Sequence, residues 1–282
     1  MEPDPLRNAF DTKAQAWDDY TRTPIGRLRE ELTLRYLSLH LPDASRAPIV
    51  LDAGGGTGGL SIALARRGFR VHLLDFAPAM LDAARSRARQ DDPIEYHCAS
   101  IEDADRLFAP GSFDLVVCHT LIEYVPNPDL AIRPLAHLLK PGGTFSLEYV
   151  NRHADVLRLA LVRAHLSDAR AALDGGTSQA DLFGVPRRTF DRDEARSILR
   201  AAGVEPIAEY GVRVFADYIV DARWQTDAAA YADLVAPEDL CAAREPYRSI
   251  ARYGLIIGKT KLSPALPTST PNTGSGRREF WI

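Results

Sequence analysis

Hydrophobic and polar positions divide the chain into two kinds of segment. Residues 1–45 are largely polar, and their apolar side chains recur at helical spacing, first at Phe10, Trp17 and Tyr20 and then along the leucine-rich stretch 25–41. From Pro48 onward, short apolar runs alternate with amphipathic stretches. This alternation is typical of βαβ units around a parallel sheet. We therefore expect a helical cap over residues 1–45 and an α/β domain over 46–261.

The apolar runs predict seven strands, with crossover helices of suitable length for right-handed connections between the first five. The strands are expected at 48–54, 70–76, 94–100, 113–119, 143–150, 204–220 and 252–259. Leu139–Gly143 is expected to end the fourth crossover helix, because it contains Pro and a Gly pair. The predicted fold is a Rossmann-like, seven-stranded, doubly wound sheet of the α/β class.

The alternation breaks after the fifth predicted strand. Residues 151–184 are rich in arginine and leucine and predict a helical insertion, which we interpret as a lid over about 151–190. A helix is expected to resume at Asp191, because Asp191 and Glu194 have capping-box spacing. Residues 227–251 are expected to be mostly helical. Residues 262–282 are rich in Pro, Ser and Thr and predict a disordered tail.

Composition narrows the class of protein. The 282 residues are 46% hydrophobic and 26% charged, with a net charge of −4, which fits an ordinary globular protein and does not favour nucleic-acid binding. No apolar stretch approaches the roughly 18 residues of a membrane helix, so we expect a cytoplasmic protein with no membrane partner. Cys98, Cys118 and Cys241 are far apart and predict neither a disulfide framework nor a metal site. The pattern carries no prediction of oligomeric state.

The stretch "VLDAGGGTGG" at 50–59 carries the candidate chemistry. Gly54, Gly56 and Gly59 fit the dinucleotide fingerprint, and no lysine follows them as in a phosphate-binding loop. Asp52 argues against NAD, because its charge would oppose a pyrophosphate at the following helix N-terminus. S-adenosylmethionine has no phosphate and carries two cationic groups, so an acidic residue favours it. The alternative interpretation is that the glycines form a purely structural turn and that Asp52 is a solvated charge at the end of the strand.

Asp75 ends the second predicted strand. It follows Gly54 by 21 residues, close to the separation of about 20 at which a carboxylate meets a ribose diol in nucleoside-binding folds. This carboxylate would serve either cofactor, and it could instead cap the next helix. An NAD-dependent oxidoreductase therefore remains an alternative.

Together, these motifs resemble those of a known family. Residues 48–150 resemble the class I S-adenosylmethionine-dependent methyltransferases, through the acidic-led glycine loop, Asp75, "FDLVV" and "LKPGG". A longer resemblance, to about Lys261, links "LIEYVPNP", "GVRVFADY" and "CAAREPYRSIARY" to the bacterial tRNA 5-carboxymethoxyuridine methyltransferases, which esterify a carboxylate on a wobble uridine. The resemblance implies a methyltransferase that binds S-adenosylmethionine.

The resemblance also implies a set of cofactor contacts. From their places in the glycine loop and at the strand ends, we add Asp52, Gly56 and Phe76 to this set. The implied contacts are Arg29, Gly54, Gly55, Asp75, Ser100, Ile101 and His119. Arg29 could pair with the methionine carboxylate, or could lie on a solvated helix face. His119 could act as a base or only as a hydrogen-bonding element. A carboxylate acceptor is already ionised at neutral pH, so no catalytic residue is expected for direct in-line transfer.

An anionic acceptor needs donors near the sulfonium. The substrate-binding candidates are Arg152, Arg213, Tyr149 and Tyr253, with Tyr218 as a further hydroxyl, and each could be structural instead. Arg213 has the strongest case, because an apolar strand must either pair it or extend it to water.

The motifs do not decide which molecule carries the acceptor carboxylate. Where the tRNA enzymes carry a lysine-rich run, this chain has only Arg187 and Arg188. From Arg152 to Arg200 the segment contains nine arginines and seven acidic residues. This balance does not favour a groove that follows phosphates. We expect O-methylation of a small or nucleoside acid, with tRNA possible. The alternatives are an O- or N-methyltransferase of a secondary metabolite and a cofactor-binding protein that transfers no methyl group.

Overall fold

A seven-stranded sheet organises the molecule, in the order β3-β2-β1-β4-β5-β9-β8. The computed structural model describes residues 4–173, 178–179 and 182–262, so the predicted tail lies outside the described residues from position 263 on. The strands are β1 Ile49–Ala53, β2 Arg70–Asp75, β3 Ile94–Cys98, β4 Phe113–His119, β5 Leu139–Val150, β8 Val204–Val212 and β9 Tyr253–Thr260. Strands β1 to β5 are parallel, and β9 runs antiparallel to both β5 and β8.

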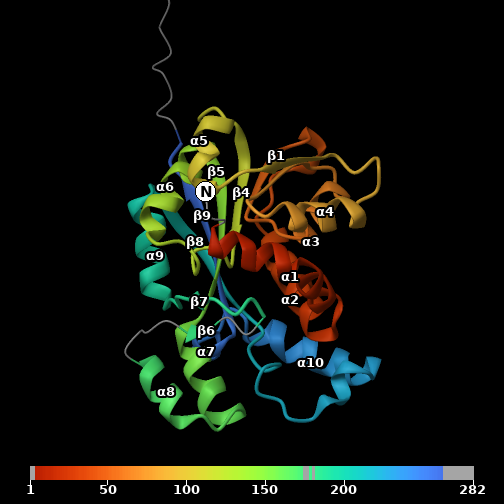
Figure 1. The fold of residues 1–282 in the computed structure, drawn as a ribbon, viewed down its shortest axis with the longest axis vertical. Helices are drawn as coiled ribbons and strands as arrows, with labels where there is room; N and C mark the ends of the chain where they lie inside the picture. Colours follow the sequence, from red (N-terminus) through yellow and green to blue (C-terminus); the bar gives the residue numbers. More distant parts are fainter. Residues whose placement is uncertain (1–3, 174–177, 180–181, 263–282) are drawn as a thin grey trace, which may run out of the picture.

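Helices cover both faces of this sheet, which confirms the doubly wound fold (Figure 1). They are α1 Pro5–Arg22, α2 Pro24–Ser38, α3 Gly59–Ala65, α4 Pro78–Arg87, α5 Ala104–Leu107, α6 Pro128–His137, α7 Arg152–Leu157, α8 Leu166–Leu173, α9 Arg192–Ala201 and α10 Ala228–Cys241. Figure 1 shows α5, α6 and α9 on one side of the sheet and α2, α3 and α4 on the other, with α7, α8 and α10 beyond the end of β5. No helix of the described residues is long and apolar enough to cross a membrane.

Alternate side chains of the central strands build two cores. Leu51 and Val116 pack with α6 and α9, whereas Val50 and Val117 pack with α2 and α3. All four side chains are fully buried. Strands buried on both faces are expected to be apolar throughout, which is why the short apolar runs predicted them correctly.

Two predicted boundaries are wrong. Helix α6 ends at His137 and Leu139 already begins β5, so the predicted helix-ending segment belongs to a strand that shifts register beside Phe113. Strand β8 ends at Val212 instead of running to Val220, because Arg213 takes a left-handed backbone conformation (φ 62°) that no strand continues.

The segment after β5 is helical, as predicted, but also contains a small ribbon. Helix α7 runs through a π-helical turn at Arg158–Val162 before α8. Strands β6 Ser178–Gln179 and β7 Pro186–Arg187 then pair antiparallel, which the sequence pattern did not predict. The predicted capping box of Asp191 and Glu194 at the start of α9 is confirmed.

The N-terminal helix α1 is tied to the glycine loop and to α4. Asp11 Oδ1 accepts a hydrogen bond from the Ala79 N–H (3.0 Å), in the first turn of α4. The N-cap residue of α4 is Ala77, whose side chain cannot accept a hydrogen bond, so Asp11 takes over this capping role. Arg87 on α4 donates to Asp18 Oδ1 (3.1 Å) on α1 and to Thr57 Oγ1 (3.1 Å) beside the loop. Helix α1 therefore forms a wall over the carboxyl ends of β1 and β2.

Candidate cofactor and acceptor site

The turn after β1 depends on glycine. Gly54, Gly56 and Gly58 all have positive φ (73°, 53° and 73°). A Cβ on Gly54 would lie 2.0 Å from Leu121 Cδ1, and one on Gly59 would lie 2.2 Å from Glu30 Oε1. The loop thus combines a backbone that favours glycine with close neighbours at Gly54 and Gly59, which would have to shift to admit a Cβ.

Asp75 joins this loop to the end of β2. Its Oδ2 accepts from the Gly56 N–H and its Oδ1 from the Ala77 N–H, both at 2.9 Å. Burial raises the pKa of Asp75 to about 6, although these backbone donors lower it. Each carboxylate oxygen can accept a second hydrogen bond, so Asp75 can still receive a ribose hydroxyl.

Asp52 lies beneath the same loop. Its Oδ2 accepts a hydrogen bond from Ser61 Oγ (2.6 Å), and burial raises its pKa to about 6. A Cβ on Gly55 would lie 2.9 Å from the same oxygen, so the carboxylate supports the loop from below. Two buried carboxylates make this turn favourable for a cation and unfavourable for a pyrophosphate.

Three cavities, of about 330, 400 and 100 Å³, meet at Gly54 and Thr120. The predicted cofactor residues all line the two larger ones: Arg29, Asp52, Gly54, Gly55, Gly56 and His119 line the first, and Asp75, Phe76, Ser100 and Ile101 line the second. Tyr253, Phe183 and Arg187 line the smallest cavity, between them. Two acidic anchors and a glycine cradle that lacks room for a Cβ fit a nucleoside with a cationic tail.

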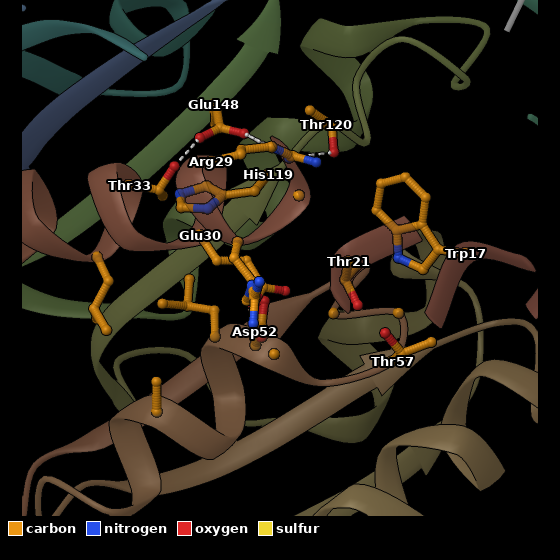
Figure 2. A pocket seen from close by; sticks show the side chains of 18 of the residues that line it. Trp17, Thr21, Arg29, Glu30, Thr33, Asp52, Thr57, His119, Thr120 and Glu148 are labelled. Carbon is orange, nitrogen blue, oxygen red and sulfur yellow. Dashed lines mark hydrogen bonds and ion pairs between the residues drawn. The ribbon is translucent and has the colours of Figure 1, made fainter. Parts of the chain in front are cut away.

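Arg29 reaches this site from α2 and is not on a solvated helix face (Figure 2). Its Nη2 and Nε lie 2.5 and 2.8 Å from Glu148 Oε1, and Nη2 also donates to Thr120 Oγ1 (3.0 Å). Thr33 Oγ1 donates to the second oxygen of Glu148 (2.5 Å). Although burial raises the pKa of Glu148, Arg29 lowers it below its usual value. Among the described residues, no partner takes the Nη1 donors of Arg29, which are free for an anionic group.

His119 is held inside the sheet. Its Nε2 lies 2.8 Å from Ser146 Oγ on β5, and burial lowers its pKa to about 4. The ring is therefore neutral near pH 7 and is a weak base. This geometry favours the interpretation of His119 as a hydrogen-bonding element.

Thr120, directly after β4, has a strained backbone. Its φ is 48°, which is unusual for a β-branched side chain, and its N–H donates to the Glu148 carbonyl (2.7 Å). Strain of this kind persists where the surroundings enforce it, often at ligand sites. Here it turns Thr120 Oγ1 toward Arg29.

Of the predicted acceptor residues, the structure brings Tyr253 to the cavities. The Arg29 guanidinium lies 4.4 Å from the centre of its ring. Arg213 lies behind that ring at 5.4 Å, buried, with Nε 2.8 Å from Asp217 and Nη1 2.9 Å from the Tyr20 hydroxyl. Arg213 can therefore act on the site through its charge and through Tyr253.

The other predicted acceptor residues have partners elsewhere. Arg152 lies 2.5 Å from Glu194 and 3.3 Å from Asp191, where it stabilises the start of α9. Tyr149 is buried on the face covered by α6 and α9 and lines a separate cavity. The Tyr218 hydroxyl donates to the Ile250 carbonyl (2.8 Å). None of these three residues lines the cavities that meet at Gly54.

Sequence reasoning missed an aromatic cluster over the smallest cavity. Phe10 stacks on Phe183 at 4.2 Å, Trp17 lies 5.5 Å from Phe183, and Phe10 lies 5.1 Å from Tyr124. Phe10 and Trp17 are seven positions apart on an amphipathic helix, a spacing that could have indicated a shared face. Phe183 comes from the segment before β7, where no periodicity marks it.

Known proteins match both the sequence and the fold. A family model described as a methyltransferase domain matches residues 51–147. The chain is 31% identical over 236 residues to the tRNA 5-carboxymethoxyuridine methyltransferase of Escherichia coli, which covers 82% of this chain and 87% of that protein. It is 43% identical over 116 residues to the ubiquinone biosynthesis O-methyltransferase of Xanthomonas campestris, over 41% of this chain and 48% of that protein.

A solved structure extends the match in fold. The structure of a Thermotoga maritima SAM-dependent methyltransferase, described as a possible histamine N-methyltransferase, superposes with a TM-score of 0.62 at 16% identity and covers 91% of this chain and 100% of that chain. At this identity the match supports the fold alone. The relative that spans most of the chain shows that this protein belongs to the S-adenosylmethionine-dependent methyltransferase family, and its fold is the class I, Rossmann-like fold.

Proposed function

We propose that this enzyme transfers the methyl group to a carboxylate oxygen. The observation that carries the proposal is the group of three guanidinium groups around the Tyr253 ring, at the smallest cavity. Although burial raises the pKa of Tyr253, the guanidinium groups of Arg29, Arg213 and Arg252 lower it below the usual value for a tyrosine. The charges that favour a negative charge at Tyr253 would also favour an anionic acceptor beside it.

We propose that the two larger cavities hold the cofactor. Asp75 would receive the ribose hydroxyls, with Phe76, Ser100 and Ile101 around the base, as the lining of the second cavity allows. Arg29 would hold the methionine carboxylate with its Nη1 donors, while Asp52 and the glycine loop favour the cationic end. When bound, S-adenosylmethionine supplies an electrophilic methyl group on a sulfonium.

The chain's own residues would then align and desolvate the acceptor. Tyr253 offers a hydroxyl donor to a carboxylate, and Phe10, Phe183 and Trp17 exclude water from the cavity. An ionised carboxylate is a nucleophile without a base, which agrees with a His119 pKa of about 4. The rate would come from alignment of oxygen, methyl and sulfur and from removal of water.

A hydroxyl acceptor is the second candidate, supported by the partial match to an enzyme named as an O-methyltransferase of ubiquinone biosynthesis. Such an acceptor requires a base. His119 is too weak, and Glu123, whose pKa burial raises to about 7, accepts from the Val150 N–H and does not line the cavities. Asp75 also lines the smallest cavity, but the Gly56 and Ala77 N–H groups already hold it and we assign it to the ribose. The site therefore favours a carboxylate.

The experiment is label transfer from methyl-labelled S-adenosylmethionine, with total tRNA in one arm and a set of small aromatic and aliphatic acids in the other. Because methyl esters hydrolyse in mild alkali, the proposal predicts label that such treatment releases. Label that survives alkali would overturn carboxylate transfer in favour of an ether or N-methyl product. Asp75→Ala is the control for transfer that depends on the cofactor site. The arm that takes up label identifies the bearer of the acid.

A further inference from the structure

Two histidines and a glutamate come together on β2 and β3, away from the cavities described above. His72 is paired with Glu95 across the parallel ladder, and His97 lies two positions further along the same face of β3. His72 Nδ1 lies 3.0 Å from His97 Nε2 and 3.6 Å from Glu95 Oε2. The three donor atoms all lie within 4.8 Å of one another.

These separations suit a small tetrahedral metal site. Zn²⁺ binds imidazole nitrogen and carboxylate oxygen at about 2.0–2.2 Å in tetrahedral geometry. Such bonds place neighbouring donor atoms about 3.3 Å apart, and the two shortest separations, 3.0 and 3.6 Å, lie on either side of that value. Two imidazoles and one carboxylate also match the ligand set of zinc sites that keep an open position.

The surroundings hold the two rings in place. Phe108 lies edge-on to both histidines, at 5.4 Å from His72 and 4.9 Å from His97, and Phe113 lies 5.4 Å from His72. Glu95 is 63% exposed, so the cluster opens to solvent on the side where an ion would enter.

We propose that His72, Glu95 and His97 bind one divalent transition-metal ion of the zinc type, with water completing the coordination. The carboxylate of Glu95 offsets the nearby positive charge of Arg70. The site would fix β2 to the edge strand β3. His72 lies three residues before Asp75, which ends β2, and His97 lies three residues before Ser100, which follows β3. Metal binding would therefore stabilise the strand ends that line the second cavity.

The test is a titration of the chelator-treated full-length protein with Zn²⁺, by calorimetry against a competing chelator, and with Co²⁺, by visible absorption. One equivalent should bind and raise the melting temperature. Glu95→Gln and His97→Ala should each weaken Zn²⁺ binding at least about tenfold. Mutation of a residue that only supports a metal ligand already costs about that much, and these two residues are proposed as ligands themselves. Glu95→Gln alters an exposed side chain and should leave the metal-free melting temperature unchanged.

His165, the exposed residue before α8, provides the matched control, because it lies 3.6 Å from Asp168 and no third ligand lies near it among the described residues. His165→Ala should leave Zn²⁺ binding unchanged. A simple hydrogen-bonded histidine pair would give a different result: no stoichiometric binding, or binding that Glu95→Gln and His97→Ala leave unaltered. Either outcome overturns the proposal.

Discussion

At the scale of single residues, Asp52 and Asp75 predict how cofactor affinity depends on pH. Burial raises the pKa of both to about 6, so both carboxylates are ionised above that pH and neutral below it. A cationic ligand favours the ionised form. We expect the affinity for S-adenosylmethionine to be full near pH 8 and to fall as the pH drops through about 6, measured by calorimetry from about pH 5 to about pH 8.

The protein without cofactor should behave in the opposite way. A carboxyl group whose pKa is raised by folding contributes stability below its unfolded pKa, and this contribution is lost as the pH rises through about 6. Asp52→Asn removes one of the two carboxylates that titrate near pH 6, so it should flatten the pH dependence of cofactor affinity. A steep fall in affinity that persists in both Asp52→Asn and Asp75→Asn would assign it to other groups.

Gly54 predicts a second residue-scale effect. Gly54→Ala places a Cβ 2.0 Å from Leu121 Cδ1 at a φ of 73°, so the Leu121 side chain must shift at the cavities and the loop backbone is strained. We expect cofactor affinity to fall by at least about tenfold, because about 1.4 kcal/mol of binding free energy is enough for that loss. Gly111→Ala is the matched control, since Gly111 has a φ of 69° with nothing within 4 Å of the added Cβ. It should cost stability and leave affinity unchanged; equal losses of affinity would contradict the prediction.

At the scale of elements, α9 predicts a stability effect. Asp191 Oδ1 accepts from the Glu194 N–H (2.9 Å), and Asp191 Oδ2 lies 3.3 Å from Arg152. Asp191→Ala should lower the free energy of unfolding by about 1–2 kcal/mol, the usual cost of losing such a cap. Asp193→Ala, two positions on and highly exposed, should change it by less than about 0.5 kcal/mol. Urea denaturation separates the two, and similar midpoints for both variants would contradict the assigned role of the cap.

The sequence predicted elements well where local pattern and tertiary packing agree. The apolar runs of β1 and β4 and the capping box at Asp191 depend on periodicity and short-range hydrogen bonds, so single-chain reasoning reached them. The end of β8 depends on Arg213, whose left-handed φ is stabilised by contacts with Asp217 and with Tyr20 from a distant helix. No local pattern records contacts of that kind.

The candidate site divides in the same way. The glycine loop and Asp75 were predictable because both sit at fixed places in a βαβ unit. Glu148 could have been noticed as a carboxylate within an apolar strand, which must find a partner when buried. That its partner is Arg29, from α2, follows only from the packing of the N-terminal helices against the sheet.

At the scale of the whole molecule, the site is assembled from three regions of the chain. Helices α1 and α2 contribute Trp17 and Arg29, the sheet contributes Asp75 and Tyr253, and the segment before β7 contributes Phe183. The proposed acceptor cavity is small, at about 100 Å³, and aromatic side chains line it. A carboxylate would enter a confined, positively charged space, whatever molecule bears it.

This arrangement, with a net charge of −4, predicts a weak dependence on salt for a small acid. One ion contact inside a covered cavity is little screened, so we expect the KM to change by less than about threefold between about 50 and about 200 mM salt. A tRNA held by about 6–10 phosphate contacts would lose about 10³–10⁵ in affinity over that range. Arg188, directly after β7, is partly exposed, so Arg188→Gln would weaken tRNA binding and leave a small acid unaffected. KM is measured across salt concentrations for the unaltered protein and for Arg188→Gln, with the acceptor that label transfer identifies. A KM that rises steeply with salt, and that Arg188→Gln raises at low salt while making the rise less steep, would assign the carboxylate to a nucleic acid.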